Sequence, residues 1–175
     1  MTNRLQRRRL GQCALALSLG WLAAGQASAD AFIALARAGN FTFASGAGQV
    51  AVPIGAGVFQ TPAFFNAAGQ RFIVSYTAEC AVAAAAGNHT TWLDLDVRAV
   101  NVATGAVFVL APTVGNADAF CTSNGTAGDD GWPMTAVNAI GGPGMPAGNY
   151  VVQVRARLSG AGTGHLGDTS LVVWR

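Results

Sequence analysis

The chain has 175 residues, of which 51% are apolar and only 10% are charged, and it contains 23 glycines and no lysine. This composition suits one globular domain and excludes disorder caused by charge, a coiled coil and a basic nucleic-acid-binding arm. Four of the ten arginines precede residue 10, so the rest of the chain holds more acidic than basic groups. We therefore expect no nucleic-acid partner.

Residues 1–29 have the three parts of a secretory signal peptide. Arginines occupy the first part, the apolar run Cys13–Ala24 is too short to span a bilayer comfortably, and Ala27-Ser28-Ala29 supplies the small residues before a cleavage site. We expect cleavage after Ala29, a single domain over residues 30–175, and a secreted or periplasmic location. The alternative is an uncleaved anchor, which would be the chain's contact with a membrane.

The first part of this domain carries short apolar segments between glycine-containing turns, which predicts short strands. These strands are expected at Ala31–Ala36, Phe41–Ala44 and Gln49–Ile54. Strict apolar–polar alternation then predicts two longer strands, Phe72–Val82 and Trp92–Ala99.

In the second long strand, leucine and valine point to one side, while Asp94, Asp96 and Arg98 point to the other. We expect this second side to face solvent and its charges to form a weak ion-pair ladder. The glycine turn Ala103-Thr104-Gly105 then predicts a hairpin to a strand at Ala106–Leu110.

A long irregular loop is expected over Pro112–Pro133, followed by a further set of strands. These are predicted at Met134–Ala139, Tyr150–Leu158 and Ser170–Trp174. About nine short strands separated by turns indicate an all-β fold, an antiparallel β-sandwich resembling a jelly roll.

Two cysteines, Cys80 and Cys121, remain after the signal peptide. An even pair in an exported chain predicts one disulfide, which would tie the long loop to a strand. Two free buried thiols are the alternative. No nearby histidine or second pair of cysteines completes a zinc site, so we expect no metal centre.

Several segments resemble a group of uncharacterised exported bacterial proteins with the same order of strands and paired cysteines. They are Tyr76–Cys80, Trp92–Asp96, Ala119–Cys121 and Ala147–Leu158. The hairpin that begins at Ala147 is also similar to that of jelly-roll heads of the tumour-necrosis-factor and complement type. These resemblances imply a fold and a compartment, and they imply no activity.

The sequence contains few residues or motifs typical of catalysis, so we predict that it has no catalytic residue and is not an enzyme. Asp94 and Asp96 would lie about 7 Å apart on one strand, a spacing that could suit the paired carboxylates of a hydrolase. A triad of His165, Asp168 and Ser170 is the other catalytic arrangement that the sequence offers, but such a cluster is typical of a solvated turn.

Ligand binding has two sets of candidates. Trp92 and Trp132 could stack on sugar rings, which would make the chain a carbohydrate-binding module. Asp129 and Asp130 lie beside Trp132 and, with Asn124, form an oxygen-rich loop of the kind that binds Ca²⁺, although a polar loop needs no ion.

The leading interpretation is a secreted, non-catalytic β-sandwich that acts as a binding or structural module. Its partner would be a glycan or another protein, and no cofactor is expected. A small outer-membrane barrel is a remote alternative, because the predicted strands are short and lack aromatic girdles.

Overall fold

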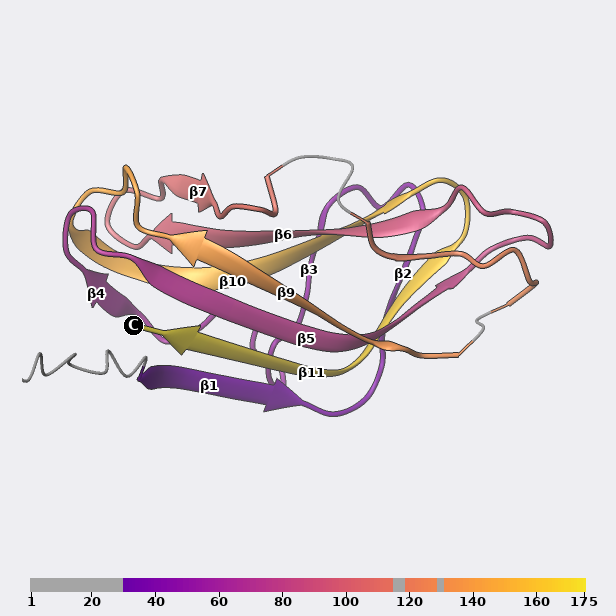
Figure 1. Cartoon of the computed structure of the whole chain (residues 1–175), viewed down its shortest axis with the longest axis horizontal. Coiled ribbons are helices and arrows are strands. Elements are labelled where there is room, and N and C mark those ends of the chain that lie inside the picture. Colours follow the sequence, from indigo (N-terminus) through magenta and orange to yellow (C-terminus); the bar gives the residue numbers. More distant parts are fainter. Residues whose placement is uncertain (1–29, 115–118, 129–130) are drawn as a thin grey trace, which may run out of the picture.

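The computed structural model describes residues 30–114, 119–128 and 131–175, so the predicted signal peptide and the pair Asp129 and Asp130 lie outside the described residues. The described chain is all-β, and its strands form two antiparallel sheets stacked face to face (Figure 1). No helix long and apolar enough to cross a membrane occurs in this part of the chain.

The first sheet, sheet A, has the strand order β1-β11-β5-β9, with β2 also paired to β11. Its strands are β1 (Ala31–Arg37), β2 (Phe41–Ala44), β5 (Phe72–Ala83), β9 (Met134–Gly141) and β11 (Thr163–Trp174).

Sheet B has the order β3-β10-β6-β7, with β4 paired to β10 and β8 paired to β6. Its strands are β3 (Val50–Ala51), β4 (Phe64–Asn66), β6 (Trp92–Asn101), β7 (Val107–Val109), β8 (Ala119–Thr122) and β10 (Gly148–Ser159).

Three strands of an eight-strand pattern are interrupted: β1 continues as β2, β3 as β4, and β7 as β8. When each interrupted pair counts as one strand, the chain crosses between the sheets in the order expected of two Greek keys, which is the jelly-roll arrangement. The predicted fold class is confirmed, with eleven strands in place of about nine.

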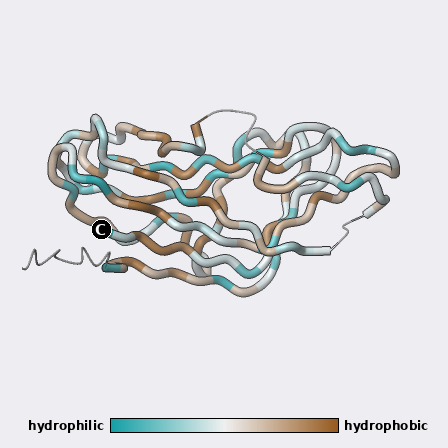
Figure 2. Tube along the Cα trace, viewed as in Figure 1, coloured by the Kyte–Doolittle hydropathy of each residue, from teal (hydrophilic) through white to brown (hydrophobic). Residues whose placement is uncertain are grey.

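Alternation explains why the long strands form where they do. In β5, β6 and β10 every second side chain points inward and is buried, among them Val74, Leu95 and Val154. Hydrophobic stretches lie along these strands in Figure 2, while many turns are pale or teal. Burial of this inner layer supplies the hydrophobic stabilisation that holds the two sheets together.

The core is covered differently beneath the two edge strands of sheet A. At the β1 edge, the segment that includes β3 and β4 packs beneath the sheet: Val52 and Ile54 are fully buried, and Arg37 Nε donates to the Pro53 carbonyl oxygen at 3.1 Å. At the β9 edge, the inward-facing Thr135 and Val137 remain half-buried. The sandwich is therefore closed along one edge and open along the other.

The short strands differ most from the sequence prediction. The expected strand Gln49–Ile54 is reduced to Val50–Ala51, because Pro53 has no N–H to donate to a ladder. β4 was not predicted, and β8 lies within the expected loop Pro112–Pro133. β11 begins at Thr163, well before the predicted Ser170, because a bulge between Gly167 and Ser170 breaks the alternation.

Candidate functional site

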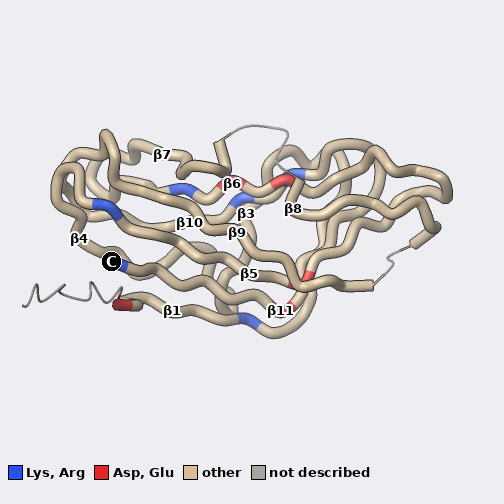
Figure 3. Tube along the Cα trace, viewed as in Figure 1, with Lys and Arg blue, Asp and Glu red and all other residues tan. Residues whose placement is uncertain are grey.

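Charged residues are spread over the described chain (Figure 3), but five of them occupy outward positions of the neighbouring strands β6 and β10 of sheet B. We call this surface the polar face and define it by the seven residues Gln49, Asp94, Asp96, Arg98, Gln153, Arg155 and Arg157. The register of the two strands explains the cluster: Asp94 lies opposite Arg157, Asp96 opposite Arg155, and Arg98 opposite Gln153. Outward positions of neighbouring antiparallel strands share a face, so the two alternating patterns superimpose.

The expected solvent-exposed ladder is wrong for Asp94. Its side chain is only 4% exposed, and Arg157, at 31%, donates from Nη2 to Asp94 Oδ2 at 2.6 Å. The pair joins β6 to β10 across the sheet. A carboxylate this deeply buried depends on its cation, because an isolated charge is costly to remove from water.

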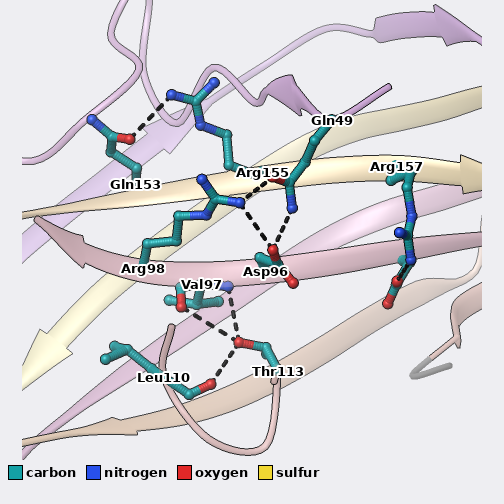
Figure 4. Close-up of polar contacts among 10 residues, drawn as sticks. Gln49, Asp96, Val97, Arg98, Leu110, Thr113, Gln153, Arg155 and Arg157 are labelled. Carbon is teal, nitrogen blue, oxygen red and sulfur yellow. Dashed lines mark hydrogen bonds and ion pairs between the residues drawn. The ribbon is translucent and has the colours of Figure 1, made fainter. Parts of the chain in front are cut away.

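Asp96 forms a second, more local group. Arg98, two residues along the same strand, contacts Asp96 Oδ2 at 3.0 Å, and the two side chains are 19% and 14% exposed. The Gln49 amide reaches across β10 and bridges this pair, since it donates to Asp96 and accepts from Arg98 (Figure 4). Gln49 thus satisfies both charges of the pair at once.

Arg155 differs from the other two arginines of the polar face. Its Nη2 donates to Gln153 Oε1 at 3.2 Å, and Gln153 donates in turn to Gln60 at 3.1 Å. Among the described residues no carboxylate lies within ion-pair distance of Arg155, whereas Arg98 and Arg157 each contact one. The side-chain partner of this half-buried guanidinium is therefore the neutral amide of Gln153.

A hollow of about 480 Å³ adjoins the Gln153 end of the polar face. Its floor is apolar, formed by Val100 and Val151, which are paired across β6 and β10. Gln60 and Gln153 stand at its rim, where the amide chain from Arg155 ends. The hollow thus combines an apolar base with amide groups and a neighbouring cation.

The two candidate stacking residues, Trp92 and Trp132, lie beside different sheets. Trp92, half-buried, lies on the outer side of β6 at the end of the polar face away from the hollow, where it is paired with Ser159. Trp132 stands edge-on to the His165 ring, with a centroid distance of 5.3 Å, and His165 belongs to β11 of sheet A. The structure therefore does not place the two indoles on one surface.

The two catalytic arrangements considered from sequence do not assemble. Asp94 and Asp96 contact different arginines and do not converge. His165 Nδ1 lies 3.3 Å from Thr42 Oγ1, while Asp168 accepts a hydrogen bond from the Gly39 N–H at 2.9 Å. His165 and Asp168 therefore contact other residues and not each other.

Of the three residues of the candidate calcium site, Asn124 is the one within the described residues, and its Oδ1 accepts a hydrogen bond from the Thr126 N–H at 2.9 Å. Asp129 and Asp130 lie outside the described residues. Within the ranges that are described, no group of three or more His, Cys, Asp or Glu side chains is arranged to hold a metal ion.

The predicted disulfide is confirmed. Cys80 of β5 and Cys121 of β8 are bonded, with their Cα atoms 6.2 Å apart. Cys80 is buried in the core, and the bridge ties sheet A to sheet B.

Sequence reasoning missed the part that β10 and Gln49 play in the polar face. The signal for Gln153, Arg155 and Arg157 was present, because they occupy the polar side of an alternating strand. The pairing with β6 was not visible, since 63 residues separate Asp94 from Arg157. No sequence pattern marked Gln49, which lies just before a two-residue strand.

Comparison with known proteins identifies no family. No family model matches the chain, and no curated protein matches it. Among solved structures it is similar to a chain from the structure of infectious bursal disease virus Gt strain, with 10% identity and a TM-score of 0.36. The match covers 85% of this chain and 36% of the viral chain, so this chain spans about a third of that neighbour's length.

Proposed function

We propose that this chain is an exported, non-catalytic binding module that recognises acidic glycans through the polar face. The observation that carries the proposal is Arg155, a half-buried guanidinium without a carboxylate partner among the described residues. Buried charges in proteins are normally paired, and a guanidinium presents a planar fork that suits carboxylate or sulfate groups.

The surroundings of Arg155 support a glycan as the ligand class. Gln153 and Gln60 offer amide groups of the kind that exchange hydrogen bonds with sugar hydroxyls. The hollow beside them provides an apolar floor, and Trp92 lies at the far end of the same face. From Val100 to Trp92 the face runs for about 27 Å along β6, which suits an extended chain of sugars.

The test is a glycan-binding screen with the purified full chain, comparing neutral glycans with glycans that carry uronic acid or sulfate. We expect binding to the acidic set, weakened by salt because part of the Arg155 guanidinium remains accessible to solvent ions. Arg155→Gln should lower the affinity about tenfold or more, as loss of a charge-assisted hydrogen bond implies.

Arg71→Gln is the matched control, because Arg71 is exposed and lies in the turn before β5, away from the polar face. It removes the same charge and should leave binding unchanged. A chain that binds no acidic glycan, or that loses affinity equally in both variants, would contradict the proposal. Binding that requires Trp132 and not Arg155 would move the site to the other sheet.

A further inference from the structure

The outer edge of β9 is an unpaired strand edge that carries no charged side chain. β9 is the last strand of sheet A on the open side of the sandwich, and no further strand pairs with it along that edge over the described residues (Figure 1). In the sequence, no charged residue occurs between Asp130 and Arg155, a stretch that includes the whole of β9. Exposed edges are usually blocked by charged side chains, and β9 has none.

The hydrogen bonds of β9 show which backbone groups face outward. The Cys80 N–H donates to the Pro133 carbonyl oxygen at 3.1 Å, so Pro133 and every second residue after it face β5. The Ile140 N–H donates to the Ala111 carbonyl oxygen at 2.7 Å, on the opposite side. Met134, Ala136 and Asn138 therefore direct their N–H and C=O groups to the free edge.

The interior behind this edge is also incompletely filled. A hollow of about 400 Å³ lies between the two sheets there, with Leu95 and Phe120 on one side and Thr135 and Val137 on the other. At the β1 edge, by contrast, Val52, Ile54 and Phe64 are buried and cover the core. β1 and β9 are both end strands of sheet A, and the two edges differ in how the core beneath them is covered.

We propose that β9 pairs with β9 of a second copy of this chain, antiparallel about a twofold axis at Ala136. In this register Ala136 faces its own equivalent, and Met134 faces Asn138 of the other copy. Three residue pairs can then exchange their backbone hydrogen bonds, and sheet A continues from one copy into the other.

The side chains of β9 favour this occupant. The residue on the axis is alanine, so two identical strands meet without a steric clash at their closest point. Since β9 carries no charge, self-pairing brings no like charges together, and such juxtaposition is what normally prevents identical edges from pairing. Met134 and Ile140, which are 59% and 48% exposed, add apolar area beside the axis.

The first test is the oligomeric state of the purified full chain by sedimentation velocity over a range of concentrations, with far-UV circular dichroism to confirm folding. We expect a concentration-dependent dimer. Ala136→Lys would place two ammonium groups across the axis and should give a folded monomer. Ala34→Lys is the control: Ala34 is exposed on β1, at the opposite edge of the same sheet, and the variant should remain a dimer.

The second test is crosslinking at the axis, which does not depend on the stability of the lysine variant. Hydrogen-bonded antiparallel residue pairs have Cα atoms about 5.5 Å apart, within disulfide range. Ala136→Cys should form a covalent dimer without reductant, whereas Ala34→Cys should stay monomeric under denaturing conditions. A monomer at all concentrations, a dimer that survives Ala136→Lys, or equal crosslinking at both positions would overturn the proposal.

Discussion

Tyr76 places a phenolic hydroxyl in the apolar core between the sheets, where it is fully buried and has no hydrogen-bond partner among the described residues. Burial raises the pKa of this phenol above its ordinary value of 10.0, and Arg37 offsets only part of that rise. The second tyrosine, Tyr150, is equally buried but donates to the Pro146 carbonyl oxygen at 2.7 Å. The two hydroxyls provide a matched comparison.

We predict that Tyr76→Phe leaves the free energy of unfolding at pH 7 unchanged or raises it by about 1 kcal/mol, because it removes an unsatisfied buried group. Tyr150→Phe should lower it by about 1 kcal/mol, because a hydrogen bond is lost. Urea denaturation of both variants measures this difference. A large loss of stability in Tyr76→Phe would show that its hydroxyl has a partner.

The same residue makes stability depend on alkaline pH. Above about pH 10 the unfolded chain loses the Tyr76 proton while the folded chain keeps it, so the folded state is disfavoured by about 1.4 kcal/mol per pH unit from this group. This contribution is absent below pH 10 and grows as pH rises toward the folded-state pKa. It should disappear in Tyr76→Phe, and an unchanged alkaline slope would contradict the assignment.

The buried pair of Asp94 and Arg157 leads to a second prediction. Asp94→Asn should lower the free energy of unfolding by about 1–3 kcal/mol, since Arg157 loses its negatively charged partner and keeps only a neutral amide, although at 31% exposure it retains some hydration. Combination with Arg157→Gln in a double-mutant cycle should show a coupling above about 0.5 kcal/mol. Asp168→Asn, at an exposed position, is the control and should stay within about 0.5 kcal/mol.

At the scale of the elements, the Cys80–Cys121 bridge joins β5 to the four-residue strand β8, which is held to β6 by a short and irregular ladder. We predict that replacing both cysteines by alanine lowers the free energy of unfolding by about 4 kcal/mol, given a closed loop of 41 residues. Reduction of the unmodified chain should have a similar effect. Equal stability of the bonded and double-alanine chains would contradict this.

The long strands could be predicted from sequence because each carries enough alternation to define two faces. β5, β6 and β10 are such cases, and their inward residues were assigned correctly. β4 and β8 could not be predicted, since strands of three or four residues have too few alternations to differ from a loop. They form because a longer neighbour, β10 or β6, offers an edge on which to pair.

At the scale of the whole molecule, sequence indicated the sandwich but not the relation between its faces. Alternation put Asp94 on a polar side, yet its burial depends on Arg157 from a distant strand. For the same reason sequence left open whether Trp92 and Trp132 share a face; Trp92 belongs to sheet B, whereas Trp132 contacts His165 of sheet A. Which residues of distant strands lie side by side depends on strand register and on how the sheets stack, and local periodicity predicts neither.

Among the described residues, the charges of the two sheets nearly cancel. The polar face carries three arginines against two aspartates. Sheet A and the residues beside it carry Arg37, Arg71 and Arg175 together with Asp30, Glu79 and Asp168 (Figure 3). With an excess of one positive charge on the polar face and none on sheet A, long-range attraction toward a negatively charged surface is weak, so short-range contacts must orient the molecule there.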